Sequence, residues 1–285
     1  MKEILISYHG GHSGDFCDHA EDLLEDVVLA YIKKGFKNFG IADHQPRTEE
    51  FLYQNEIDLG HNSTDLFFAF DEYVKKAKSL QKKYRMNANI LVGFETDMCG
   101  KNPLKLIDDL RSRYGPDYIV GSVHHVKNVS FYNKEYYEQA IKICGSLEKL
   151  YENYYELQYD LIMECKPEVI GHFDFIKLFS EDFEPSENVI KLMERNIEAV
   201  ISYGGVFEVN SRAFKKGLKE PFPGRKILKM IKEMDGLITL GDDSHSASQV
   251  GLHYDKMIPI VKEFFDEVVA FKRTERGIEK VFYKI

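Results

Sequence analysis

The stretch NILVGFE (residues 89–95) is a short run of mainly branched apolar residues that ends on a carboxylate. Runs of this length and composition are typical of parallel strands that are buried on both faces. Six further stretches have the same character: EILISY (3–8), NFGIAD (38–43), DYIVGSV (117–123), EVIGHF (168–173), GVFEVN (205–210) and LITLGD (237–242). The sequence therefore predicts seven strands.

Longer amphipathic segments lie between these strands and are typical of helices. They cover residues 20–35, 63–84, 105–115, 146–165, 185–205 and 224–236. Strands that alternate with helices indicate an α/β fold built around a parallel sheet. No linker or low-complexity tract divides the chain, so we expect a single domain over residues 1–285, in which the irregular segment 45–63 is a candidate lid over a site.

The composition is that of an ordinary globular protein, with 44% hydrophobic and 30% charged residues. A net charge of -9 disfavours nucleic acid as a partner, since polyphosphate binding depends on clustered lysine and arginine. No apolar run reaches the roughly 20 residues of a membrane helix. The apolar stretch at the N-terminus is too short for a signal peptide. We therefore expect a cytoplasmic protein without a membrane partner, whose four cysteines, lacking any CxxC pair, are reduced thiols.

Side chains of the metal-binding type follow nearly every predicted strand. Seven of the 10 histidines occupy such positions: His9, His12, His44, His124, His125, His172 and His245. In a closed barrel the C-terminal ends of parallel strands meet on one face, so these residues would converge there together with carboxylates such as Glu95 and Asp243. Imidazole and carboxylate together suit zinc, iron or manganese, and the number of ligands exceeds what one ion needs. The alternative for any single residue, such as His125, is simple packing.

The motifs HSGDFCDHA (12–20), GIADHQPR (40–47), GFETD (93–97), GSVHHV (121–126), VIGHFDFIKLF (169–179), FEVNS (207–211) and TLGDDSH (239–245) resemble those of the polymerase and histidinol phosphatase (PHP) superfamily. Within it, the chain is most similar to the monofunctional histidinol-phosphatases. The resemblance implies a distorted, TIM-barrel-like (β/α)7 barrel with two to three divalent ions at the C-terminal ends of its strands. It places the metal ligands at His12, His19, His44, Glu95, His124, His172, Asp243 and His245.

The same resemblance implies a division of these ligands among ions. Glu95 would bridge two ions, His124 and His172 would complete the second, and His19, His44 and His245 would hold the third. The implied reaction is the hydrolysis of L-histidinol phosphate in histidine biosynthesis by a metal-bound hydroxide, without a side-chain nucleophile.

Four residues are candidates for contact with this small phosphomonoester. Arg47 and Arg212 follow predicted strands, and a guanidinium can bind phosphate in a bidentate manner. Asn210 is a candidate substrate contact, and Glu208 would either bind the substrate amine or orient a metal ligand. For each arginine, the alternative is a solvated loop residue.

The first motif departs from the family pattern. The family has His-x-His at the end of the first strand, whereas Gly10 stands two residues before His12 in this chain. Either a ligand is missing, or His9 serves in its place while the extra glycine forms a bulge, which glycine tolerates well. This departure keeps open a PHP module that does not catalyse. A second alternative, independent of the first motif, is a PHP phosphoesterase for another small phosphate or a nucleotide.

Overall fold

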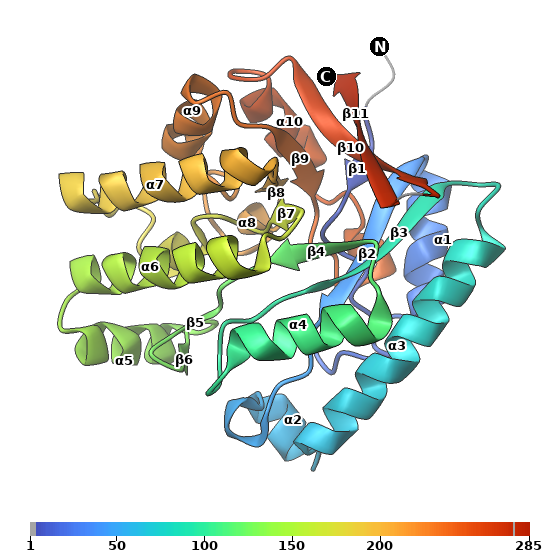
Figure 1. The fold of residues 1–285 in the computed structure, drawn as a ribbon, viewed down its shortest axis with the longest axis horizontal. Helices are drawn as coiled ribbons and strands as arrows, with labels where there is room; N and C mark the ends of the chain where they lie inside the picture. The colour runs from blue at the N-terminus through green and yellow to red at the C-terminus, as the bar shows by residue number, and fades with distance from the viewer. Residues whose placement is uncertain (1–3, 276) are drawn as a thin grey trace.

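The structure is a computed structural model that describes residues 4–275 and 277–285. At its centre, seven strands form one sheet in which each strand is parallel to its neighbours (Figure 1). In spatial order they are β1 (Ile6–Ser7), β2 (Asn38–His44), β3 (Asn89–Glu95), β4 (Tyr118–Gly121), β7 (Val169–Ile170), β8 (Val206–Asn210) and β9 (Ile238–Gly241). All seven predicted strands are confirmed, although the first and the fifth are shorter than expected, with two residues each, and residue 3 lies outside the described residues.

The sheet curls until its first and last strands meet. The backbone N–H of Tyr8 donates to Leu240 O at 3.0 Å, and that of Asp242 donates to His9 O at 3.1 Å. These bonds join the chain just after β1 to β9 and to the residues just after it. The predicted α/β fold is therefore confirmed as a nearly closed, distorted seven-strand barrel of the TIM-barrel type.

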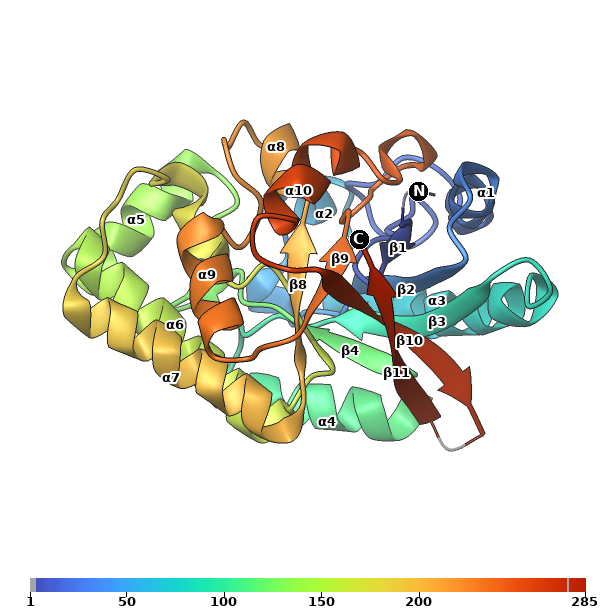
Figure 2. The same ribbon diagram turned by 90° about the horizontal axis from the view of Figure 1, so that it is seen from above.

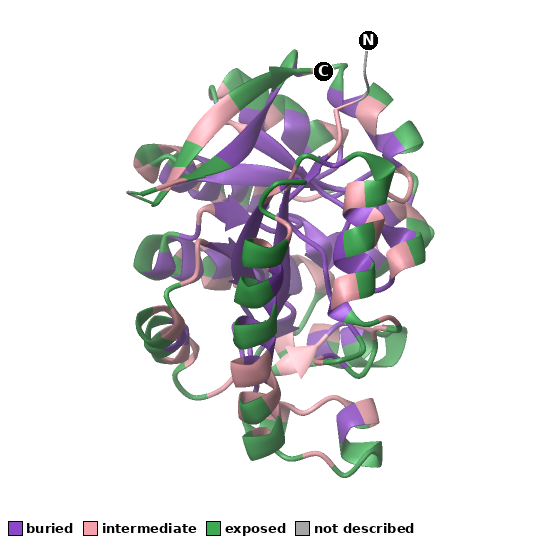
Figure 3. Ribbon diagram, turned by 90° about the vertical axis from the view of Figure 1, so that its right-hand side faces the viewer, coloured by how far each residue is buried: buried purple, intermediate pink, exposed green. Residues whose placement is uncertain are grey.

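Helices surround the barrel and bury their apolar faces against it, so that purple strands lie inside green outer helix faces in Figure 3. The six predicted helical segments correspond to α1 (Leu24–Lys34), α3 (Ser63–Lys83), α4 (Pro103–Tyr114), α6 (Leu147–Cys165), α7 (Glu187–Tyr203) and α9 (Arg225–Glu233). Gly35, Gly115 and Gly204 end three of them in the left-handed conformation that glycine adopts without strain.

Several elements were not predicted. Two are the helices α5 (Lys134–Cys144) and α10 (Tyr254–Val261), and a third is the antiparallel hairpin of β10 (Glu267–Thr274) and β11 (Gly277–Lys284). The hairpin packs at the end of the barrel away from α2 (Gln54–Asp58), where Tyr8 Oη donates to Phe271 O and Thr239 Oγ1 donates to Val269 O (Figures 1 and 2). It thus covers the N-terminal ends of the strands and leaves the opposite end to the loops.

Apart from α5, the loops at the C-terminal ends of the strands contain several short elements. They are the 3₁₀ turns Glu49–Phe51, Phe175–Phe179 and Ala247–Gln249, the helices α2 and α8 (Arg212–Lys215), and the small hairpin of β5 (His125–Val126) and β6 (Val129–Ser130). Within the described residues, no helix is long and apolar enough to cross a membrane.

Candidate metal centre

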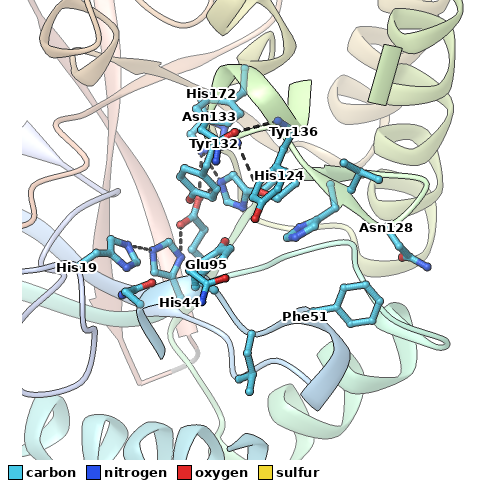
Figure 4. A pocket seen from close by; sticks show the side chains of 18 of the residues that line it. His19, His44, Phe51, Glu95, His124, Asn128, Tyr132, Asn133, Tyr136 and His172 are labelled. Carbon is cyan, nitrogen blue, oxygen red and sulfur yellow. Dashed lines mark hydrogen bonds and ion pairs between the residues drawn. The ribbon is translucent and has the colours of Figure 1, made fainter. Parts of the chain in front are cut away.

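The predicted ligands meet at the C-terminal end of the barrel, as Figure 4 shows for His19, His44, Glu95, His124 and His172. Each is delivered by the end of a strand or by the loop after it, and most are buried because they face the barrel axis. Their donor atoms form overlapping groups in which every atom lies within 4.8 Å of the others. Among these groups are His9, His12 and Glu95; His9, His172 and Asp243; Glu95, His124 and His172; and His12, His44 and His245.

Glu95, the last residue of β3, lies at the middle of the cluster with 1% of its surface exposed. Its Oε1 is 3.1 Å from His9 Nε2, 3.0 Å from His172 Nε2 and 3.3 Å from His124 Nε2. Its other oxygen, Oε2, is 2.9 Å from His44 Nδ1. A carboxylate with imidazoles on both oxygens has the arrangement of a ligand that bridges two ions.

The charges around Glu95 favour a bound cation. Burial raises the pKa of Glu95, but the adjacent imidazoles of His9 and His124 lower it to well below its usual range. Burial likewise lowers the pKa of His124, but Glu95 and Asp97 raise it to about 10. The carboxylates at this end of the cluster therefore stabilise positive charge, which either protons or metal ions can supply.

The other end of the cluster favours neutral imidazoles. Burial, followed by the neighbouring His12, lowers the pKa of His44 and of His245. A metal ion binds the neutral form of a histidine side chain, and the lowered pKa values favour that form in His44 and His245. His19 joins them from the first loop, where its Nε2 lies 3.2 Å from His44 Nε2.

His9, not residue 10, supplies the first position of the cluster. Gly10 and Gly11 have φ angles of 153° and 82°, so the backbone between His9 and His12 leaves the regular strand geometry. Both imidazoles are fully buried and lie with Glu95 in one donor group, at a ring-centroid distance of 5.9 Å. The structure thus places His9 where the bulge interpretation of the first motif expects it.

Carboxylates behind the cluster orient the imidazoles. His9 Nδ1 is 3.0 Å from Glu208 Oε2, and His12 Nδ1 is 3.2 Å from Asp43 Oδ1. Such contacts fix the tautomer of a ligating histidine and direct its other nitrogen to the metal. Within the described chain, the inward Nε2 atoms of His9 and His12 have no hydrogen-bond partner. Each nitrogen nevertheless faces a carboxylate oxygen, since His9 Nε2 is 3.1 Å from Glu95 Oε1 and His12 Nε2 is 3.5 Å from Asp243 Oδ1. Buried nitrogens and oxygens that face each other in this way fit divalent ions.

Two of the predicted substrate contacts lie behind the ligands and not in the cavity. Glu208 and Asn210 are fully buried, and Asn210 Nδ2 donates to Glu208 Oε1 at 2.9 Å. Glu208 Oε2 also accepts the backbone N–H of His172 at 2.8 Å. Of the two roles considered for Glu208, the geometry supports the orientation of a ligand. Asn210 supports Glu208 in turn, so its predicted contact with substrate is not supported.

The two predicted arginines have different surroundings. Arg212 lines the cavity above the cluster, where its Nη1 donates to Asp243 O at 2.6 Å and to Gln249 Oε1 at 3.1 Å. Arg47 is 4% exposed, forms an ion pair with Glu56, and holds its Cζ 3.8 Å from the ring centroid of Tyr53. Its place within this buried pair makes Arg47 a support of the segment 45–63, in contrast to its predicted role.

The cavity has a volume of about 700 Å³ and opens above the metal ligands. Residues 50–55 and 57 line one side, which agrees with the expected lid-like role of the segment 45–63. Aromatic side chains form much of the wall, including Phe51, Tyr53, Tyr132, Tyr136 and Phe175. Lys216 also lines the cavity and was missed in the sequence, where it is one of many loop lysines.

His125, for which packing was the alternative, is held by a carboxylate. Its Nδ1 is 3.0 Å from Asp97 Oδ1, and its ring is parallel to that of Tyr53 with the centroids 6.3 Å apart. His125 belongs to the wall of the cavity, and it is in none of the donor groups named above.

Comparisons with family models and with curated proteins indicate the same family. The PHP domain matches residues 9–212. A protein of Schizosaccharomyces pombe named "Probable histidinol-phosphatase" is 42% identical in an alignment of 282 residues that covers 95% of this chain and 90% of that protein. A histidinol-phosphatase of Saccharomyces cerevisiae is 28% identical, with 93% and 89% of the two chains covered.

A solved structure shares the fold. The histidinol phosphate phosphatase of Lactococcus lactis, crystallised with zinc, L-histidinol and phosphate, has a TM-score of 0.74 to this chain. It is 20% identical, and the alignment covers 97% of this chain and 99% of that one. At this level of identity the similarity establishes the barrel, while residue roles depend on the geometry described above.

Proposed function

The chain belongs to the PHP domain family, and we propose that it is a metal-dependent phosphatase that hydrolyses L-histidinol phosphate to L-histidinol and phosphate. The relatives that match over nearly its whole length carry the name histidinol-phosphatase. In keeping with that name, the reaction would serve histidine biosynthesis.

One observation carries this proposal: imidazoles from separate strands and loops converge on the buried carboxylate of Glu95 beneath an open cavity. A structural metal site is normally closed by protein ligands, whereas a catalytic site keeps a position open for water or substrate. Ligands that border a cavity of about 700 Å³ therefore favour catalysis over a purely structural role.

We assign the ligands to three ions. His9 and His12 would hold the first, His124 and His172 the second, and His19, His44 and His245 the third, with Glu95 and Asp243 between them. Divalent ions such as zinc, iron or manganese would supply Lewis acidity and a water activated at neutral pH. The L. lactis enzyme, which was crystallised with zinc, supports zinc as the first ion to test.

The walls of the cavity offer contacts to both the phosphoryl group and the imidazole ring of the substrate. Arg212 and Lys216 offer positive charge to the phosphoryl group beside Asp243. The aromatic side chains of Tyr53 and Tyr132 offer flat surfaces to an imidazole ring. The segment 45–63 would limit access of bulk water, which strengthens electrostatic interactions within the site.

The test is phosphate release from a panel of phosphomonoesters, with the protein stripped of metal and then reloaded with zinc, manganese or iron. We expect the highest kcat/KM for L-histidinol phosphate, no activity after chelation, and recovery on reloading. Faster turnover of a nucleotide or another small phosphate would assign the chain to a different phosphoesterase. A reloaded protein with bound metal and no turnover of any ester would identify a non-catalytic module. The role in histidine biosynthesis is tested by expressing this protein in a strain that lacks histidinol-phosphatase and measuring growth on medium without histidine.

A further inference from the structure

A second, much smaller cavity lies on the other side of the His19 and His44 imidazoles. Its volume is about 30 Å³, and its lining includes Cys17, His19, Asp43, His44, Gln45 and Arg47. A space of this size holds a species the size of one water molecule or one ion. Because His19 and His44 border both cavities, any ion that they bind can also be reached from Cys17.

Cys17 places its sulfur next to these imidazoles. Sγ lies 3.3 Å from His19 Nε2, and His19 Nε2 lies 3.2 Å from His44 Nε2. In a tetrahedral zinc site with Zn–S of about 2.3 Å and Zn–N of about 2.0–2.1 Å, neighbouring donor atoms are about 3.3–3.6 Å apart. Two of the three separations are therefore close to those between ligands of one ion. The donor atoms of Cys17, His19 and His44 also form one donor group, in which every atom lies within 4.8 Å of the others.

Asp43 provides an independent indication of a ligand at this place. It is 2% exposed, and its Oδ1 is engaged by His12 Nδ1 and by the backbone N–H of His44. Its Oδ2 has no hydrogen-bond partner within the described residues. An unpaired buried carboxylate oxygen is costly, and a cation beside it removes that cost.

We propose that Cys17 binds the ion shared by His19 and His44 as a thiolate, with Asp43 Oδ2 beside it. The inference rests on the proposed metal centre and adds a ligand to it. When the ion binds, the S–H bond breaks, a sulfur–metal bond forms, and the proton is released to solvent. A thiolate is a soft donor, so this position would favour zinc or ferrous iron over manganese, whereas the other positions offer only nitrogen and oxygen.

Cobalt(II) tests this directly, because a thiolate bound to cobalt gives an intense charge-transfer band in the near ultraviolet that nitrogen and oxygen ligands do not give. We expect the band in the fully cobalt-loaded wild-type protein. Cys17→Ser should remove it while the weaker visible bands of the remaining ions persist, and should weaken the binding of one ion at least about tenfold.

Cys144→Ser is the matched control, since Cys144 is a partly buried cysteine at the end of α5 and belongs to none of the donor groups named above. It should keep the band and all bound ions. If Cys17→Ser does not fold, 113Cd NMR of the wild-type protein gives the same answer, because a sulfur ligand shifts one cadmium resonance downfield.

The outcomes separate this inference from the proposed function. A fully loaded wild-type protein without the charge-transfer band, or a Cys17→Ser variant that keeps it, would overturn the assignment of Cys17 even if histidinol phosphate is hydrolysed. A band that depends on Cys17 in a protein without phosphatase activity would uphold the ligand and reject the function.

Discussion

His9 Nδ1 lies 3.0 Å from Glu208 Oε2, and neither residue has any exposed surface. This contact links the end of the first strand to the sixth strand of the barrel, since Glu208 belongs to β8. The same carboxylate accepts the backbone N–H of His172 and the side-chain amide of Asn210. One buried carboxylate thus fixes two of the predicted metal ligands, and it accounts for how His9 is held after the irregular glycine pair.

Glu208→Gln tests this role. The carboxylate faces three N–H donors, so the amide of a glutamine would have to point its own N–H groups at one of them, leaving a buried donor unpaired. We expect metal affinity to fall about 10–100-fold, as for other partners of ligating histidines. Competition with a chelator measures this.

The matched control is Glu168→Gln, because Glu168 accepts the backbone N–H of Ile119 at 2.9 Å and contacts no metal ligand. It should leave metal affinity unchanged. Wild-type affinity in Glu208→Gln would show that the orientation of His9 does not depend on the carboxylate.

The glycine pair leads to a second prediction. A Cβ at position 10 would lie 2.4 Å from both Asp242 Oδ1 and Tyr31 Oη, and these two atoms already share a hydrogen bond of 2.6 Å. Gly10→Ala should therefore lower the free energy of unfolding by about 1–3 kcal/mol and displace His9 from the cluster. Urea unfolding and metal analysis check the two effects.

Gly217→Ala separates crowding from backbone strain. Gly217 has a φ of 90°, and a Cβ there would meet nothing within 4 Å. Equal losses of stability in the two variants would leave strain as the whole cause and contradict the argument from crowding. A histidine at position 10 would place its Cβ in the same close contacts as an alanine. We therefore expect that Gly10→His cannot restore the family's His-x-His pattern in this chain.

The sequence predicted the barrel well because its strands are apolar on both faces and end on polar ligands. This double signal located β3 to the residue, with Glu95 at its end. The hairpin β10–β11 was not predicted because its exposed second strand lacks a continuous apolar face. Helix α5 was not predicted because residues 134–144 were not among the amphipathic segments singled out in the sequence.

The residues of the site were predictable only in part. A metal ligand can be recognised in the sequence by its residue type and by its position at the end of a strand. His9, Glu95 and His172 could be predicted in this way. Position in the sequence does not show whether a side chain faces the cavity or the layer behind it. Arg47 was therefore predicted to contact substrate, and the role of Glu208 was left open between the substrate amine and a metal ligand, although each is paired with a buried neighbour. Cys17 was not predicted, although His19 is only two residues away, because the chain has no CxxC pair and His44 comes near only through the fold.

Arg47 leads to a prediction about stability. It is buried with Glu56, and removal of one partner from a buried ion pair leaves an uncompensated charge. Arg47→Met should therefore lower the free energy of unfolding by about 3–5 kcal/mol. Chemical denaturation measures this, and KM for the substrate should stay near the wild-type value. An increase in KM without a loss of stability would instead restore Arg47 as a phosphate contact.

Arg212 should show the opposite behaviour. Its guanidinium lines the cavity, and its Nε lies 3.6 Å from Asp243 Oδ2, so a phosphoryl group near the metal ligands would come within its reach. A hydrogen bond to a charged group contributes about 1.5–3 kcal/mol, which corresponds to roughly 10–150-fold in binding. We expect Arg212→Met to raise KM and the inhibition constant of inorganic phosphate by a factor in this range. Arg212→Lys should recover part of the loss because it keeps the charge and loses the planar fork.

Two controls make this prediction specific. Metal content must be measured in each variant, because Arg212 also holds the carbonyl of Asp243 and its removal could disturb a ligand. Arg195→Met provides the matched loss of an arginine, since Arg195 pairs with Glu156 on the outer helices. A fall in kcat with bound metal intact and unchanged inhibition by phosphate would place the role of Arg212 in the chemical step and not in binding. Unchanged kinetics would leave Lys216, the other cation on this wall, to hold the phosphoryl group.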